Sequence, residues 1–270
     1  VSATATTRVL EWSADAAEGG PLRAVVLVPK NPDPAGHPVL FALHGRGEAL
    51  KGPALGAWGW PRDYALTRAL DRVASPPLTA RDLEGLASPA YLEAKNRRLA
   101  ARPYGGMVVV CPYVPDLDLR GDGEARAYGA QLLATLLPWV RASTPARSEP
   151  WATGIDGVSL GGFAALTIGL AYPTEFGAVS GLQPALQSEP VSPWVEKALA
   201  ARARNPRLAL RLLTSDGDYF RGVVGRVSQA LRDAGVEHVH EVVRGPHDYV
   251  WNRGPGAYEL LLWNDEALRG

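Results

Sequence analysis

The sequence predicts an α/β fold in which helices cover both faces of a mostly parallel sheet. Short runs rich in β-branched residues alternate with longer runs whose apolar residues recur at helical spacing. One short run, GMVVVCPY at 106–113, is almost wholly apolar, which is typical of a strand buried on both faces of a parallel sheet. The chain has 270 residues, of which 46% are hydrophobic, so we expect one domain over 1–270 with a single large core.

The predicted strands and helices follow from these runs in chain order. Strands are expected at 22–29, 38–45, 106–113, 151–156, 176–182, 208–215 and 238–245. Helices are expected at 124–142, 161–172, 221–236 and 257–268. Pro138 should kink the first helix or mark a boundary in it, because proline cannot donate the backbone hydrogen bond. Gly235 should close the third helix.

The connection from Glu48 to Gly105 is far longer than the usual few residues between neighbouring strands. It contains GAWGWPRDYALTRALDRVA, a Pro-Pro pair and a charged, mostly helical stretch. Such an insertion is either an elaborated surface or a cap over a site. We expect a helical insertion at 48–105 that forms a partial cap.

Charge and cysteine content exclude several classes of function. The 28 basic and 28 acidic residues give a formal net charge of zero, which argues against nucleic acid or an anionic membrane as the main partner. The sequence contains no run of eighteen apolar residues, so no membrane-spanning helix is predicted. Cys111 is the only cysteine, so an internal disulfide is impossible and a cysteine-based metal site is not expected.

The first residues, VSATATT, resemble a small, polar end left after processing. They favour an exported location, periplasmic or extracellular, over a cytoplasmic one. The oligomeric state cannot be predicted from these features.

The stretch GIDGVSLGGFAAL at 154–166 contains the pattern G-x-S-x-G around Ser159. This pattern is typical of a sharp strand-to-helix turn that exposes a nucleophilic serine. Because five positions can match by chance, the interpretation depends on finding a base and an acid later in the chain, in the order Ser, Asp or Glu, His.

His247 is the best candidate for the base among the five histidines. It follows the last predicted strand, where a loop can bring it over the edge of the sheet. His44 precedes the serine and would break the expected order, and His37 lies in a proline-rich turn where we expect it to face solvent. His238 and His240 alternate along a predicted strand as packing or surface residues.

The acid is predicted in the segment LALRLLTSDGDYFR, where Asp218 and Asp216 both follow the preceding strand. We prefer Asp218 and keep Asp216 as the alternative, since sequence places loop boundaries only within a few residues. The carboxylate would fix the tautomer of the histidine and stabilise its charged form. The oxyanion of an acyl-transfer reaction would be bound by two backbone N–H groups, those of Leu160 and Arg46.

The run GVSLGGFAAL at 157–166, followed by AYPTEFGAVSGL at 171–182, resembles the putative-esterase group of α/β-hydrolases. This group includes enterochelin esterases, esterase D-like enzymes, feruloyl and acetylxylan esterases and mycolyltransferases. LFALHGRG at 40–47 is similar to the group's oxyanion strand, and the segments 214–220 and 235–252 are similar to its acid and histidine segments. Two features depart from the group: the length of the insertion, and Asp156 at a position that is usually apolar.

The resemblance implies an α/β-hydrolase fold and a triad of Ser159, Asp218 and His247, with no metal or organic cofactor. It also implies the amides of Arg46 and Leu160 as the oxyanion hole. The expected activity is hydrolysis of a small-molecule or saccharide carboxylic ester through an acyl-enzyme. The alternatives are an acyltransferase or a peptidase with the same triad, and a non-catalytic binding protein that retains the fold.

Several aromatic residues in the predicted loops are candidates for binding the substrate, because aromatic walls suit an acyl chain, a phenolic acid or a sugar. About half of them should instead pack the insertion onto the body, since tryptophan is usually well buried. The candidates are Trp58, Trp60, Tyr113, Trp194, Tyr219, Tyr249 and Trp251.

Overall fold

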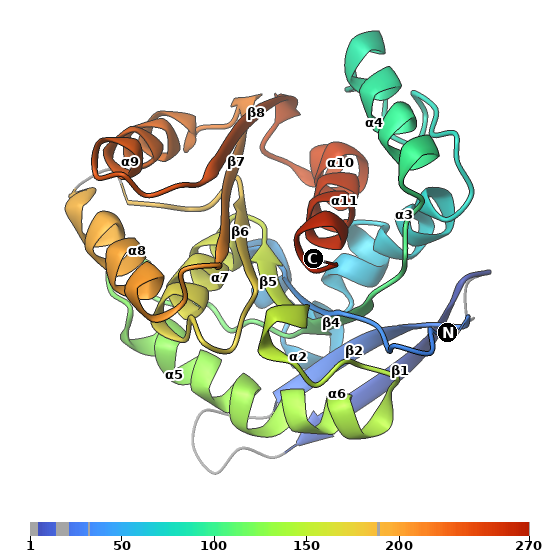
Figure 1. The fold of residues 1–270 in the computed structure, drawn as a ribbon, viewed down its shortest axis with the longest axis horizontal. Coiled ribbons are helices and arrows are strands. Elements are labelled where there is room, and N and C mark those ends of the chain that lie inside the picture. Colours follow the sequence, from blue (N-terminus) through green and yellow to red (C-terminus); the bar gives the residue numbers. More distant parts are fainter. Residues whose placement is uncertain (1–4, 15–21, 32, 188–189, 270) are drawn as a thin grey trace.

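A central eight-stranded sheet organises the computed structural model, which describes residues 5–14, 22–31, 33–187 and 190–269 (Figure 1). The first four residues of the small, polar terminus lie outside these ranges. The strand order is β1-β2-β4-β3-β5-β6-β7-β8. The pairs β1–β2 and β2–β4 are antiparallel and the others are parallel. The strands are β1 (Thr7–Ala14), β2 (Leu22–Pro29), β3 (Val39–Leu43), β4 (Val108–Pro112), β5 (Thr153–Gly157), β6 (Ala178–Leu182), β7 (Ala209–Gly217) and β8 (Val239–Pro246).

The helices lie between and after the strands. They are α1 (Arg46–Ala49), α2 (Pro53–Gly56), α3 (Leu66–Val73), α4 (Pro89–Ala101), α5 (Gly123–Gln131), α6 (Leu137–Ser143), α7 (Leu160–Ala171), α8 (Ser192–Arg204), α9 (Arg221–Asp233), α10 (Tyr249–Trp251) and α11 (Ala257–Ala267). Within the described ranges, no helix combines the length and the apolar character needed to cross a membrane. The predicted α/β class and the mostly parallel sheet are confirmed.

Alternate residues of β2, β3 and β4 enter two separate hydrophobic clusters. Val39, Phe41 and Leu43 of β3 pack with residues of α5 to α9, which gather on one side of the sheet (Figure 1). Leu40 and Ala42 face the other way and pack with α11 and the segment 48–105. Both faces of the sheet are therefore covered, as the uninterrupted apolar strands require.

The segment 48–105 supplies much of the second helical layer. Leu70 of α3 and Leu99 of α4 share a cluster with Leu261 of α11. Arg98 Nη2 donates to the carbonyl of Leu262 at 2.5 Å, which fixes α4 on the outer side of α11 (Figure 1). The insertion thus completes the core beside α11, and its role as a partial cap stays a prediction.

Strand β1 and the helices α8 and α10 escaped the sequence analysis. Strand β1 lies at the sheet edge and is largely half-exposed or exposed, and α8 is a 13-residue helix of mixed polarity. Pro138 lies in the first turn of α6 and marks a boundary within the predicted helix at 124–142, as expected. A π-helical turn over Leu132–Leu136 joins α5 to α6 and accommodates the missing N–H of the proline.

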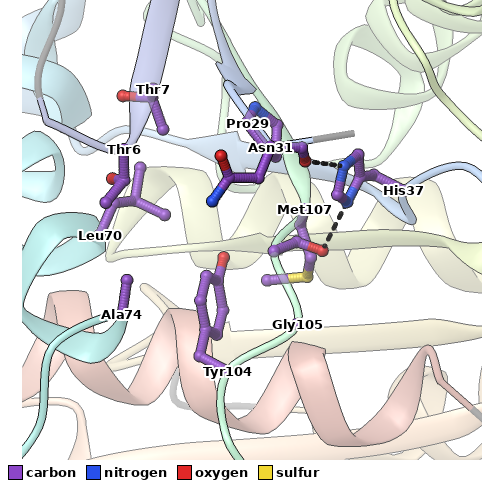
Figure 2. Close-up of a pocket in the computed structure, with 11 residues that line it drawn as sticks. Thr6, Thr7, Pro29, Asn31, His37, Leu70, Ala74, Tyr104, Gly105 and Met107 are labelled. Carbon is purple, nitrogen blue, oxygen red and sulfur yellow. Dashed lines mark hydrogen bonds between the residues drawn. The ribbon is translucent and has the colours of Figure 1, made fainter. Parts of the chain in front are cut away.

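His37 is buried, and the expectation that it faces solvent is wrong. Its Nε2 lies 3.1 Å from the carbonyl oxygen of Asn31, and its Nδ1 lies 3.4 Å from that of Gly106 (Figure 2). With Tyr104 and Met107 it lines a cavity of about 110 Å³. This cavity lies where the parallel strands β3 and β4 begin, at the opposite end of the sheet from Ser159.

Candidate active site

Ser159 lies at a tight turn between β5 and α7, with φ 57° and ψ −116°. A residue with a side chain rarely adopts a positive φ, and such strain costs about 1–3 kcal/mol. The turn is held by hydrogen bonds from the surrounding chain. The amide of Ser159 donates to Leu182 at 3.0 Å, and its carbonyl accepts from Ala185 at 3.0 Å. The strained geometry matches the elbow predicted from the G-x-S-x-G pattern.

The two glycines of the pattern are required by close packing. A Cβ atom on Gly157 would lie 2.4 Å from the carbonyl oxygen of Gly161. A Cβ atom on Gly161 would lie 2.2 Å from the carbonyl oxygen of Leu43 at the end of β3. Helix α7 can therefore begin directly against β3 and β5 only because both positions lack a side chain.

His247 and Asp218 meet at the same edge of the sheet, in the loops that follow β8 and β7. His247 Nδ1 lies 2.7 Å from Asp218 Oδ1. Asp218 also accepts hydrogen bonds from the Thr214 hydroxyl at 2.6 Å and from the amide of Phe220 at 2.9 Å. The carboxylate is thus fixed from three directions, and Nε2 of His247 is left for another partner.

Asp216, the alternative acid, has a different task. Its Oδ1 accepts a hydrogen bond from the amide of Gly245 at 2.8 Å, which braces the loop before His247. The structure brings Asp218, and not Asp216, to the imidazole.

Two aromatic rings pack against the imidazole of His247. The Tyr219 ring centroid lies 4.3 Å from that of His247, and the Phe220 centroid lies 5.5 Å away at a steep angle. Tyr219 is 72% exposed, so its other face is open to solvent at the mouth of the site.

The loop after β3 lies beside the serine. A Cβ atom on Gly45 would lie 3.7 Å from Cβ of Ser159. Arg46 and Leu160 are the first residues of α1 and α7, where backbone N–H groups have no partner within the helix. Neither amide donates a hydrogen bond within the described part of the chain. Both are therefore available to a ligand atom near Ser159.

His44 fixes the peptide that carries the Arg46 amide. Its Nε2 accepts a hydrogen bond from the amide of Val114 at 2.9 Å, so the proton must be on Nδ1. Nδ1 then donates to the carbonyl of Gly45 at 2.9 Å, which belongs to the same peptide unit as the Arg46 N–H. Burial lowers the pKa of His44 to about 4, although the hydrogen bond to Gly45 acts in the opposite direction.

This low pKa predicts a pH-dependent contribution of His44 to stability. Between pH 6.5 and 4 the unfolded chain binds a proton at His44 that the folded chain does not, so the contribution is complete above pH 6.5 and is lost as the pH falls towards 4. The loss is about 3 kcal/mol. The free energies of unfolding of wild type and His44→Asn, measured in urea, should therefore converge by about this amount between pH 7 and pH 4. A constant difference would show that His44 titrates normally.

Gln183 is a further residue of this edge that the sequence analysis missed. It is buried with φ 44°, and its amide donates to the carbonyl of Leu213 at 2.6 Å. Its Nε2 donates to the Ser215 hydroxyl at 2.6 Å and to the carbonyl of Pro246 at 3.0 Å. Gln183 thus ties together the ends of β6, β7 and β8. The only signal in the sequence was a polar side chain directly after an apolar strand.

Asp156 supports the elbow from inside the protein. One carboxylate oxygen accepts a hydrogen bond from the amide of Gly157 at 2.8 Å. The other lies 3.2 Å from Nη2 of Arg211 and 2.9 Å from Nδ2 of Asn264. The charge that departs from the family pattern therefore belongs to a buried ion-pair network.

The aromatic candidates divide into core and site residues. Trp60 and Trp251 are completely buried and Trp58 is 6% exposed, so the prediction that they rim the site is wrong for all three. Their bulk packs the insertion and α11 onto the sheet. Tyr219 and Tyr249 lie close to the site, the first against His247 and the second two residues after it.

Two larger cavities lie outside the cluster of Ser159, Asp218 and His247, and none of these three residues lines either cavity. One, of about 370 Å³, is lined by Tyr113 and by Asp116, whose carboxylate accepts from Arg46 Nε at 2.6 Å. The other, of about 430 Å³, is lined by Phe163 and Trp194, whose rings lie 6.0 Å apart. Phe163 lies one turn along α7 from the serine, and its amide donates to the Ser159 carbonyl at 3.0 Å.

Solved structures with the same fold cover nearly the whole chain. A ferulic acid esterase has a TM-score of 0.70 at 17% identity, over 97% of this chain and 99% of that one. An S-formylglutathione hydrolase from Staphylococcus aureus has a TM-score of 0.65 at 14% identity, over 96% and 99%. The enterobactin esterase of Shigella flexneri has a TM-score of 0.61 at 16% identity, over 99% of this chain and 62% of that one. Likeness at these identities shows a shared α/β-hydrolase fold.

A comparison with protein-family models identifies the family as well as the fold. The comparison with curated protein sequences gives no match. The family model described as "Putative esterase" matches residues 103–252, more than half of the chain, and this range contains Ser159, Asp218 and His247. The predicted resemblance is thereby confirmed. The protein is a carboxylic ester hydrolase, and the chain belongs to the putative esterase family.

Proposed function

We propose that the protein cleaves its ester through an acyl-enzyme intermediate, with Ser159 as nucleophile, His247 as general base and Asp218 as the orienting acid. The 2.7 Å contact between His247 Nδ1 and Asp218 Oδ1 carries the proposal. It leaves Nε2 as the basic nitrogen, at the sheet edge where the strained turn exposes Ser159.

In the first half of the reaction, Nε2 of His247 takes the proton from the Ser159 hydroxyl while Oγ attacks the carbonyl carbon of the ester. The negative charge that develops on the carbonyl oxygen is bound by the N–H groups of Arg46 and Leu160. Asp218 stabilises the charged imidazole, which then returns the proton to the leaving alcohol. In the second half, Nε2 of His247 takes a proton from a water molecule, whose oxygen attacks the carbonyl carbon of the acyl group. The proton then passes to Oγ of Ser159 as the free acid leaves.

We further propose a small-molecule or saccharide ester as substrate. The cavity beside Tyr113 and the cavity beside Phe163 and Trp194 are the candidate sites for its two halves, and the exposed ring of Tyr219 lies against His247. One solved structure similar to this chain is a feruloyl esterase module complexed with sinapinate, an aromatic acid. The aromatic lining supports an aromatic or other planar acyl group here.

The assignment of the acid is tested by a matched pair of substitutions. Asp218→Asn removes the carboxylate that accepts from His247 Nδ1, so kcat should fall by about 10³- to 10⁴-fold. Asp216→Asn keeps an oxygen that can accept from Gly245, so kcat should fall by less than about 10-fold. Both constants are measured with p-nitrophenyl acetate at pH 8.

The reverse order of effects would make Asp216 the acid and overturn the proposed triad. Thermal melting of both variants serves as the control, because neither substitution should unfold the protein at the assay temperature.

A further inference from the structure

Glu48 is a fully buried carboxylate that belongs to neither the proposed triad nor the oxyanion hole. It lies in α1, two residues after Arg46 and at the start of the long insertion. The packing around it is tight, since a Cβ atom on Gly59 would lie 2.5 Å from Cγ of Glu48 and 3.1 Å from Cβ of His44. A buried carboxylate is costly unless its oxygens accept hydrogen bonds, so its partners show what it does.

Each oxygen of Glu48 receives a tyrosine hydroxyl from a different part of the chain. Oε2 accepts from Tyr64, which lies 16 residues away in the insertion. Oε1 accepts from Tyr249 at 2.5 Å, which lies 201 residues away and two residues after His247. Lys51 Nζ lies 3.3 Å from Oε1 and 2.8 Å from Asp63, so the carboxylate also has a nearby cation.

Tyr64 continues the connection to the loop beside the serine. Its hydroxyl oxygen accepts a hydrogen bond from the amide of Gly45 at 3.3 Å while its proton is donated to Glu48. His44 holds the carbonyl of the same glycine. Gly45 is therefore fixed on both sides, which sets the direction of the next N–H group, that of Arg46.

We propose, on the basis of the function proposed above, that Glu48 is a positioning residue that couples the oxyanion loop to the histidine loop. Through Tyr64 it orients the Gly45–Arg46 peptide, and through Tyr249 it fixes the segment that carries His247. The reaction requires both loops to be aligned with Ser159, because displacing the hydrogen-bond donor or the base by about 1 Å can lower the rate by about 100-fold. Glu48 touches no reacting atom and acts through its two tyrosines.

The coupling is tested with Glu48→Gln, Tyr64→Phe and Tyr249→Phe, assayed with p-nitrophenyl acetate. Each variant should lower kcat by about 10- to 100-fold while KM stays within about 3-fold, because binding is retained and transition-state alignment is lost. Tyr64→Phe combined with Tyr249→Phe should lower kcat about as much as the larger single effect, since both act through one carboxylate. Tyr258→Phe is the matched control and should keep kcat within 2-fold. It is a buried tyrosine whose hydroxyl has no hydrogen-bond partner among the described residues.

Gly47→Ala gives a second test that retains every hydrogen-bonding group. The added methyl would lie 2.7 Å from the Tyr249 hydroxyl and must displace it from Glu48, while alanine favours the helix. We expect a fall in kcat similar to that of Tyr249→Phe, with a melting temperature no lower than that of Tyr249→Phe, because both changes remove the same hydrogen bond. Unchanged kcat in Gly47→Ala and Tyr64→Phe, or single effects that multiply in the double variant, would overturn the coupling.

The outcomes separate the coupling from the catalytic proposal. If turnover persists in Ser159→Ala, the proposed function fails. If turnover depends on Ser159 but not on Glu48, Tyr64 or Tyr249, only the coupling fails.

Discussion

Ser159→Ala should remain folded and hydrolyse p-nitrophenyl acetate at least about 10⁴-fold more slowly than the wild-type protein. The hydroxyl is the atom that would form the acyl-enzyme, and removing the nucleophile from such a triad leaves only the contribution of the oxyanion hole and binding. The turn itself should survive, because alanine has the same backbone cost at φ 57° as serine. The melting temperature of the variant should therefore stay close to that of the wild type.

The same variant tests the intermediate directly. A fluorophosphonate probe should add one adduct to the intact wild-type protein and none to Ser159→Ala, as measured by mass spectrometry. Rapid mixing of the wild type with p-nitrophenyl acetate should give a burst of about one p-nitrophenol per protein. Ser88→Ala, which removes the hydroxyl that caps α4, is the control and should keep both the adduct and the burst.

Adduct formation at another residue, or full activity in Ser159→Ala, would contradict the assignment. A folded wild-type protein that forms no adduct would favour the alternative of a non-catalytic binding protein that retains the fold.

The fold was predictable because β3 and β4 are uninterrupted apolar runs that only a doubly covered sheet can bury. Strand β4 is the clearest example, with all five residues buried. Strand β1 lies at the sheet edge and was missed, because its half-exposed residues resemble those of a loop. The elbow was predictable because close backbone packing requires glycine at 157 and 161. This requirement appears in the sequence as the local pattern G-x-S-x-G.

The supporting contacts of the site could not be predicted, because they join residues that are distant in the chain. Tyr249 and Glu48 are separated by 201 positions, and no local pattern signals that they meet. The choice between Asp216 and Asp218 depended on the path of a loop over a few residues. Trp60 and Trp251 were misassigned because a tryptophan in a loop can point either to solvent or into the core, and here both fill the core.

Arg211 is the centre of the buried network below the elbow. Its side chain is fully buried, with Nη2 3.2 Å from Asp156 and Nη1 3.2 Å from Glu259. Its Nε donates to the Ser180 hydroxyl at 3.0 Å. Burial acts to raise the pKa of Glu259, but Lys95 and Arg211 outweigh it and hold the pKa below its usual value. Burial raises the pKa of Asp156, and Arg211 opposes that shift. One guanidinium therefore compensates two buried carboxylates.

Arg211→Met should lower the free energy of unfolding by about 3–5 kcal/mol, because it leaves those carboxylates buried without their shared cation. The melting temperature should fall by about 10 °C. Arg97→Met is the matched control. Arg97 pairs with Glu93 on the surface, where both side chains are about two-thirds exposed, and its loss should cost less than about 1 kcal/mol. Urea unfolding at pH 7 measures both.

The ion pair, and not only the volume of the arginine, should account for this loss. Adding Asp156→Asn to Arg211→Met removes the charge of one of the two carboxylates that have lost Arg211. The free energy of unfolding should rise by at least about 1 kcal/mol relative to Arg211→Met alone. Glu259 keeps Lys95, whose Nζ lies 2.5 Å from it, so the second carboxylate still has a cation. If the double variant were less stable than Arg211→Met alone, the buried charges would not be the cause, and lost packing against the Trp263 ring, 4.6 Å from the guanidinium, would replace them as the explanation.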